Sequence, residues 1–311
     1  MRFFDMSACA VLALAACHCA ALAGEPSTAR LAFAAEGKEF RFDTGLLRGS
    51  LRREGRSLGL GPVTDTASGA ALAGPYGLFS HYRLLDAERR YGDGAWGWAS
   101  AARLLPDGAV EAHWAADQVH PFDLKAVYRW AAPDTLDVTT SVVAKKDLSG
   151  MEVFLASYFV GFSQSFVYVK ACPEAGGKAG FLEARKPSGV WQMFPRDAEA
   201  VKLLADGRWR RPPSPVDWKV MPQFAGALGL RRSARTGLTA LVMAPPGDCF
   251  AVATPYGEEG HGSLYLSLFG CDIKAGETAT ARSRLIIGGD ISNERAIALY
   301  DAYVKSLEGN R

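Results

Sequence analysis

The chain has few of the residues on which thiol and metal chemistry depend. Three of its six cysteines lie before residue 20, and the remaining three, Cys172, Cys249 and Cys271, are far apart with no C-x-x-C pair. This spacing excludes zinc-ribbon and thioredoxin-type sites. Two alternatives stay open for an exported chain: Cys249 pairs with Cys271 and leaves Cys172 over, or all three are free thiols.

Signatures of several other function classes are also missing. The formal net charge is only +2, and no run of lysine or arginine stands out, so we expect no nucleic-acid partner. No G-x-S-x-G motif supplies a serine nucleophile. The acidic residues are scattered through turns, so no pair of glycosidase carboxylates can be assigned. No set of ligands is complete by spacing, and we therefore predict no metal and no cofactor.

Long apolar runs are absent except at the N-terminus. Residues 8–21 are almost entirely apolar, which is too short for a bilayer span and typical of a signal-peptide core. Ala21-Leu22-Ala23 is an A-x-A cleavage site, so we predict a signal peptide over 1–23 and an exported, periplasmic or extracellular protein. In a second interpretation, Leu14 to Cys17 is a lipobox and Cys17 carries a lipid anchor.

Beyond residue 30 the pattern is of short strands separated by turns. Pro106-Asp107-Gly108 is a strong hairpin signal, because proline presets one turn dihedral and glycine tolerates the positive one. Strands at regular spacing without alternating helices predict packed antiparallel sheets. We therefore predict one all-β domain over 24–311, a large antiparallel β-sandwich. The clearest predicted strands cover 40–42, 46–51, 122–130, 135–143, 151–159, 166–170, 238–243, 250–254, 263–269 and 278–287.

Two helices and one long loop complete the prediction. A short helix is expected over 197–205, and a C-terminal helix begins after a cap at Ser292 or Asn293. The C-terminal helix carries an apolar stripe and should pack across a sheet end or edge. Segment 208–218 is rich in proline but contains Trp209 and Trp218, so we expect an ordered loop over the sheet that forms one wall of a cleft.

Two stretches of the sequence resemble a known family. His120-Pro121-Phe122, AVYRW, the strand at 135–143 and EVFLASYF are similar to the central run of an aldose 1-epimerase. SLYLSLFGCDIKAGETATARSRLII is similar to that family's late strand, turn and closing strand. The chain thus resembles the galactose-mutarotase-like superfamily. The resemblance implies a mutarotase-like supersandwich with a concave sheet face that binds carbohydrate.

The resemblance breaks at the catalytic positions of that family. Its general acid is the first residue of His-x-Tyr-Phe, where this chain has Ala156 followed by Ser157, Tyr158 and Phe159. Its general base is a Glu near the end of the late strand, and residues 266–270 contain no carboxylate. Because ring-opening epimerisation needs both groups, we expect no ordinary mutarotase activity. Tyr158 remains a candidate for binding substrate.

The richest candidate site lies in PYGLFSHYRLLDAERRYGDGAWGW, residues 75–98. Aromatic faces stack on the C–H faces of sugars, guanidinium groups grip carboxylates, and imidazole moves protons near neutral pH. Here His81 would be the acid/base. The alternative is that this aromatic block is simply core. The proposed binding residues of this segment are Arg83 and Arg90 as clamps, with Tyr91, Trp96 and Trp98 as a stacking platform.

A second candidate is the dyad of Glu259 and His261 in a glycine-rich segment, where the carboxylate is close enough to pair with the imidazole. A solvated turn has the same sequence pattern. Three functional hypotheses follow. The protein is an exported carbohydrate isomerase or lyase, a non-catalytic carbohydrate-binding module, or a structural envelope protein. The sequence leaves open whether it is an enzyme.

Overall fold

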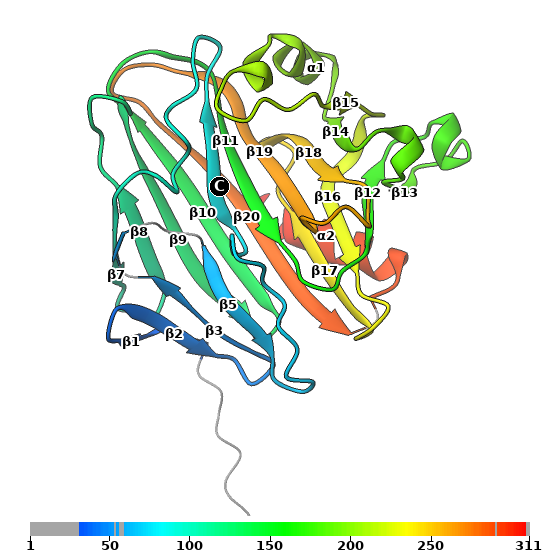
Figure 1. The fold of residues 1–311 in the computed structure, drawn as a ribbon, viewed down its shortest axis with the longest axis horizontal. Helices are drawn as coiled ribbons and strands as arrows, with labels where there is room; N and C mark the ends of the chain where they lie inside the picture. Colours follow the sequence, from blue (N-terminus) through cyan, green and yellow to red (C-terminus); the bar gives the residue numbers. More distant parts are fainter. Residues whose placement is uncertain (1–30, 53, 56–58, 290, 309–311) are drawn as a thin grey trace, which may run out of the picture.

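The computed structural model describes residues 31–52, 54–55, 59–289 and 291–308. The predicted signal peptide, with Cys17 and the cleavage site at Ala23, lies outside the described residues. Within them, two large sheets face each other and a smaller sheet covers one end (Figure 1). This arrangement confirms the predicted all-β antiparallel sandwich with a C-terminal helix. No helix in the described ranges is long and apolar enough to cross a membrane.

The sheets are described here by strand order. All neighbouring strands are antiparallel except β14 and β15. The four-stranded sheet contains β1 (Ala34–Glu36), β2 (Glu39–Asp43), β3 (Leu47–Arg52) and β5 (Leu60–Asp65). The ten-stranded sheet runs β13 (Gly180–Glu183), β12 (Gln164–Val169), β16 (Phe224–Arg232), β17 (Leu238–Met243), β20 (Thr278–Gly289), β10 (Thr135–Ala144), β9 (Phe122–Ala132), β8 (Val110–Trp114), β7 (Ser100–Leu104) and β4 (Glu54–Gly55). The six-stranded sheet runs β15 (Lys219–Val220), β14 (Trp191–Pro195), β18 (Cys249–Pro255), β19 (Ser263–Ile273), β11 (Leu148–Tyr158) and β6 (Ser80–Leu85).

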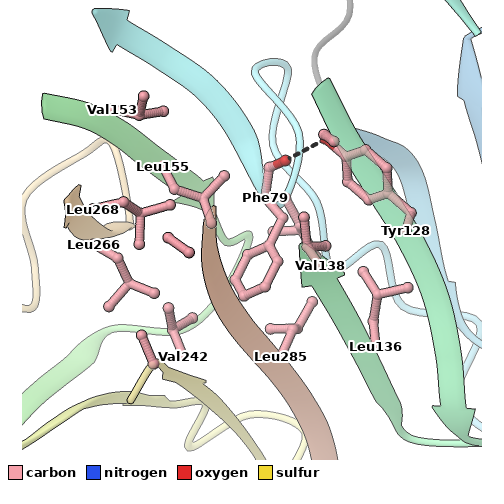
Figure 2. Close-up of a cluster of buried hydrophobic side chains, with 14 of the residues drawn as sticks. Phe79, Tyr128, Leu136, Val138, Val153, Leu155, Val242, Leu266, Leu268 and Leu285 are labelled. Carbon is pink, nitrogen blue, oxygen red and sulfur yellow. Dashed lines mark hydrogen bonds between the residues drawn. The ribbon is translucent and has the colours of Figure 1, made fainter. Parts of the chain in front are cut away.

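The main core lies between the two large sheets. Strand alternation places every second residue of β11 there, including Val153 and Leu155, opposite Val138 of β10. Figure 2 shows these side chains with Phe79, whose carbonyl accepts a hydrogen bond from the Tyr128 hydroxyl at 2.9 Å. Each such side chain, fully buried, contributes about 1.5–3 kcal/mol, so this interface is the main source of stability.

The C-terminal helix α2 (Asn293–Glu308) packs on the outer face of the ten-stranded sheet (Figure 1). The Ser292 hydroxyl accepts a hydrogen bond from the backbone N–H of Arg295 and so caps the helix. Tyr300 and Tyr303 point at leucines and isoleucines of β16, β17 and β20. The predicted cap and apolar stripe are confirmed. The helix lies across a sheet face, however, and not at an end or edge as predicted.

The outer face of the six-stranded sheet carries a second apolar cluster. It includes Phe154, Tyr158 and Tyr265 from the sheet, with Trp209 and Trp218 from the segment that covers it. That cover consists of α1 (Ala198–Ala205) and residues 208–218. We call residues 208–218, including the 3-10 turn Arg208–Arg210 with which they begin, the 208–218 loop. The predicted helix at 197–205 and the predicted ordered loop are both confirmed. The helix and the loop together enclose a space on the outer face of the six-stranded sheet.

The three cysteines of the described chain are free thiols: Cys172 is half-buried, Cys249 is buried and Cys271 is exposed. Of the two alternatives left open by the sequence, the structure therefore has three unpaired thiols and no bridge from Cys249 to Cys271. Burial raises the pKa of Cys249 to about 12, so this thiol stays protonated and behaves as a small apolar side chain.

Candidate functional site

A cavity of about 400 Å³ lies between the outer face of the six-stranded sheet and the 208–218 loop. The loop supplies one wall, as the sequence predicted. Its lining is rich in aromatic rings with polar tips. The sheet contributes Tyr82, Arg83, Phe154, Tyr158, Trp191 and Tyr265; the loop contributes Trp209, Trp218 and residues 214–217; His261 closes one side.

A β-bulge in β6 decides which side chains reach this cavity. Phe154 of β11 is paired with Arg83, but Leu155 is paired with His81, so Tyr82 is the extra residue. A bulge turns two successive side chains toward the same face. Tyr82 and Arg83 therefore both point to the cavity, whereas His81 points to the core.

Gly94 lies outside β6 and stabilises the bulge through a close contact between the two backbones. Its φ is +102°, and a Cβ at this position would lie 1.6 Å from the carbonyl oxygen of Tyr82. The same carbonyl accepts a hydrogen bond from the backbone N–H of Ala95 at 3.1 Å. Only glycine permits this approach of two backbones. Gly94 of segment 75–98 thus serves a close contact between two backbone segments.

His81 lies between the two large sheets and not in the cavity. It is 1% exposed, with Nε2 2.9 Å from the Thr140 hydroxyl and Nδ1 3.4 Å from the Tyr128 hydroxyl. Tyr128 donates its own proton to Phe79, so it accepts from Nδ1–H, and Nε2 accepts from Thr140. Burial lowers the pKa of His81 to about 3. A neutral, enclosed imidazole cannot exchange protons with a sugar, which corrects the acid/base role we expected.

The other aromatic candidates of segment 75–98 are also mostly structural. Tyr91 is fully buried and its hydroxyl donates to Asp86, and Trp98 stacks on His120 at 3.9 Å. Trp96 is sandwiched between Tyr76 and Tyr82, at 5.0 and 4.2 Å between ring centroids, so neither of its faces is free. Trp96 and Trp98 lie in a turn segment between β6 and β7. Only Tyr82, at the end of the stack, lines the cavity.

Of the two predicted clamps, Arg83 faces the cavity, and Arg90 lies close enough to feel the charge of Arg83 without being part of the lining. Arg83 donates from Nη2 to the carbonyl of Ser214 at 2.9 Å. Its guanidinium carbon lies 4.9 Å from the centre of the Trp209 ring and 5.0 Å from that of Tyr82. Arg90 donates from Nη1 to the carbonyl of Pro213. Burial and the positive charge of Arg83 lower the pKa of Arg90.

The predicted hydrogen-bonded dyad of Glu259 and His261 forms, and His261 lines the cavity. Glu259 Oε1 lies 2.7 Å from His261 Nδ1, and its Oε2 accepts the backbone N–H of His261 at 2.9 Å. Trp191 lies 5.6 Å from the imidazole, measured between ring centroids. Half of the His261 side chain is exposed, so its Nε2 is accessible. The dyad therefore forms within an exposed turn, with His261 in the cavity lining and Glu259 outside it.

Tyr158 and Tyr265 form the floor of the cavity. Their rings meet edge to face at 5.9 Å, and Tyr265 also stacks on Phe154 at 4.6 Å. Burial raises the pKa of Tyr265 to about 12 and raises that of Tyr158 further. Both phenols are therefore neutral and can donate or accept hydrogen bonds from a polar ligand.

A buried ion pair fixes the start of the 208–218 loop. Arg208 and Glu152 are both fully buried, with Nη1 3.2 Å from Oε2. Arg208 also binds Asp206 at 2.8 Å, and Glu152 accepts from the Ser267 hydroxyl at 2.9 Å. Burial raises the pKa of Glu152, partly offset by Arg208. This network anchors the loop to β11 and so maintains the roof of the cavity.

A cavity of about 630 Å³ occurs elsewhere, on the four-stranded sheet, but its lining has no histidine, tyrosine or tryptophan. Its aromatic rings are those of Phe33 and Phe42, which have no polar group to bond to a sugar hydroxyl. We therefore place the candidate site beneath the 208–218 loop. No group of three or more metal-ligating side chains was found among the described residues.

Sequence reasoning missed several members of this site. Tyr82, Trp191 and Tyr265 stand in strands whose outward faces could not be distinguished from core faces. Trp209 and Trp218 carried a usable signal, because two tryptophans in a proline-rich loop are costly to leave in water.

No protein-family profile and no curated protein matches the chain. Among solved structures it is similar to a putative aldose 1-epimerase from Escherichia coli, at 10% identity and a TM-score of 0.44 over 83% of this chain and 98% of that one. It is also similar to a galactose mutarotase-like protein from Lactobacillus casei, at 9% identity and a TM-score of 0.42 over 80% and 100%. An α-N-acetylgalactosaminidase from Bifidobacterium bifidum matches at 11% and 0.46, over 88% of this chain and 39% of the larger protein. These likenesses concern the fold alone, so the roles of residues rest on the cavity.

Proposed function

We propose that this protein binds a saccharide in the cavity beneath the 208–218 loop. The observation that carries the proposal is the lining: Trp191, Trp218, Tyr158 and Tyr265 combine ring faces with polar tips in one enclosed space. Rings of this kind stack on sugar C–H faces while phenol and indole groups bond to hydroxyls. A volume of about 400 Å³ also falls within the range of small-molecule pockets.

Two indole N–H groups without a hydrogen-bond partner also support saccharide binding. Nε1 of Trp218 and Nε1 of Trp209 are buried and have no hydrogen-bond acceptor among the described residues. Both side chains line the cavity. A buried donor without a partner costs about 1–3 kcal/mol, and a sugar hydroxyl in the cavity would accept from it. A purely apolar ligand would leave this cost in place.

Calorimetric titration with a panel of neutral and acidic oligosaccharides tests the proposal. Trp218→Ala should weaken binding at least tenfold, about 1.4 kcal/mol, because it removes a wall of the cavity. Tyr168→Ala is the matched control, since this half-buried tyrosine lies on β12, beside Phe181 and outside the cavity. Equal affinity in Trp218→Ala and the wild type, or no binding by the wild type, would contradict the proposal.

Catalysis by the Glu259–His261 dyad is a second candidate, favoured by its hydrogen bond. Glu259 accepts from Nδ1–H, which leaves Nε2 of His261 as the base. Such a base suits those isomerases and lyases whose reaction begins with removal of a proton from carbon. His261→Gln should abolish turnover of a bound sugar but keep its binding, whereas His81→Gln should keep both. Turnover by His261→Gln at the wild-type rate would leave only the binding function.

Export is part of the same proposal. It is supported by the apolar segment 8–21 and the Ala21-Leu22-Ala23 site. Mass spectrometry of the mature N-terminus distinguishes the two forms considered. Cleavage by a signal peptidase would begin the protein at Gly24, and lipidation would begin it at a modified Cys17. An N-terminus at Met1 in the cell fraction would contradict export.

A further inference from the structure

Two guanidinium groups at or near one side of the cavity have no carboxylate within ion-pair distance among the described residues. Arg83 is 3% exposed and lines the cavity, and Arg90 is half-buried beside it. Of the ion pairs found between described residues, none involves either arginine, although many other arginines of this chain have a carboxylate partner. Fully buried Arg208 has both Glu152 and Asp206 in reach, whereas fully buried Arg231 is satisfied by backbone carbonyls and the Thr254 hydroxyl.

The donors of the two arginines are also incompletely used. The hydrogen bonds that Arg83 makes within the described chain, to Ser214 and Tyr82, all start from Nη2. Nε of Arg83 and Nε of Arg90 are buried without an acceptor there. A guanidinium carries five N–H donors, so Nε–H and the Nη1 hydrogens of Arg83 remain for a ligand.

Holding the two groups together is unfavourable for the protein alone. Like charges repel in a partly desolvated space, and burial of an unpaired charge is expensive. The lowered pKa of Arg90 has burial as its first cause and the charge of Arg83 as the next, and Tyr82 and Asp93 offset them only in part. The loop carbonyls of Pro213 and Ser214 fix both guanidinium groups without neutralising them. The missing component is an anion.

We infer that Arg83 and Arg90 form an anionic subsite, so that the saccharide bound in this cavity carries a carboxylate or sulfate group. The inference rests on the proposed function and specifies its ligand as an acidic sugar. Arginine binds planar carboxylates and sulfates through parallel N–H donors, and such charge-assisted hydrogen bonds are about twice as strong as neutral ones. The tyrosines and tryptophans of the lining then hold the ring while the arginines hold its acidic substituent.

Arg211 provides the matched control. It donates from Nη1 to the carbonyl of Asp86 at 2.9 Å and from Nη2 to that of Ala87 at 2.5 Å, so it also ties the 208–218 loop to the strands beneath. Like Arg90 it is not part of the cavity lining, but its bonds go to residues 86 and 87, whereas those of Arg83 and Arg90 go to the adjacent carbonyls of Ser214 and Pro213. Arg211→Gln therefore removes one positive charge and a loop contact, as Arg90→Gln does, but leaves the proposed subsite intact.

The experiment compares oligosaccharides that differ only in charge. Binding is measured by calorimetry for oligogalacturonate and hyaluronan fragments, for their uncharged methyl esters, and for a sulfated and an unsulfated galacto-oligosaccharide. We expect at least one acidic form to bind about tenfold or more tightly than its neutral match, with affinity falling as salt rises. The carboxylate and sulfate arms identify which anion the site takes.

Variants of the two arginines test whether they cause the preference for acidic saccharides. Arg90→Gln and Arg83→Gln should remove most of the preference for the acidic form and most of the salt dependence, and Arg211→Gln should retain both. Arg83 is buried, so Arg90→Gln keeps the test valid if Arg83→Gln does not fold. Equal binding of acidic and neutral forms would overturn the inference while the proposed function stands. Absence of binding by every saccharide would overturn both.

Discussion

Replacement of His81 by glutamine should make the protein less sensitive to acid. In the folded state the imidazole is enclosed by Trp114, Tyr128 and Thr140, and burial lowers its pKa to about 3, from 6.5 when free in solution. The unfolded chain therefore binds a proton below pH 6.5 that the folded protein does not bind. Protonation favours the unfolded state, so stability falls as pH decreases from 6.5 toward 3.

The magnitude follows from the separation of the two pKa values. Stability falls by about 1.4 kcal/mol per pH unit for each proton bound only by the unfolded state. Relative to neutral pH, this amounts to about 2 kcal/mol at pH 5 and to about 4 kcal/mol at pH 3. A loss of 2 kcal/mol is a large part of the usual stability of a folded domain.

Urea unfolding of the wild type and of His81→Gln at pH 7.5 and pH 5.0 measures this effect. Glutamine lowers stability at both values because it disturbs the hydrogen bonds to Thr140 and Tyr128. The difference in free energy of unfolding between the two proteins should nevertheless shrink by about 2 kcal/mol at pH 5.0. His113→Gln, which removes a half-exposed imidazole, separates burial from simple loss of a histidine. A difference that is the same at both pH values would refute a buried neutral His81.

Two further predictions concern the scaffold of the cavity. Gly94→Ala should destabilise the protein by about 2 kcal/mol or more, because a Cβ would lie 1.6 Å from the Tyr82 carbonyl, whereas Gly97→Ala meets nothing nearer than 3.8 Å. Thermal unfolding of both variants checks this, and similar melting temperatures would contradict it. Glu152→Gln should cost about 3 kcal/mol and expose the 208–218 loop to limited proteolysis, because it leaves Arg208 with one carboxylate fewer. The exposed Glu199 is the control: Glu199→Gln should change stability by less than about 0.5 kcal/mol, and equal protease sensitivity of the two variants would argue against the anchor.

Much of the fold could be predicted because strand alternation and turn chemistry are local. The strand predicted over 135–143 is β10, and the Pro106-Asp107-Gly108 turn joins β7 to β8. The apolar face of the C-terminal helix, which includes Tyr300 and Tyr303, could be predicted in the same way. Trp191–Pro195 and Phe224–Arg232 are strands that we did not predict. Their sequences lack a clear alternation, because β16 is buried along most of its length and β14 is short.

The candidate site was predictable only in parts that depend on short separations in sequence. Glu259 and His261 are two residues apart, and their pairing needs only a turn. Tyr265 and Trp218 line the same cavity although they lie in different segments of the chain. No periodic pattern in the sequence indicates that they are close in space. His81 and Arg83 stand two residues apart, so simple alternation would give them the same face. The bulge at Tyr82 separates them.

The sequence by itself determined that this chain forms antiparallel sheets, ends in a packed helix and gathers aromatic and basic residues near residue 90. These properties follow from neighbours along the chain. Only the tertiary structure decided which of those residues share a cavity. Sheet pairing inserts one extra residue in β6, and that single insertion sends His81 to the core and Arg83 to the space beneath the 208–218 loop. The chemistry of the site therefore depends on register, which no single strand specifies alone.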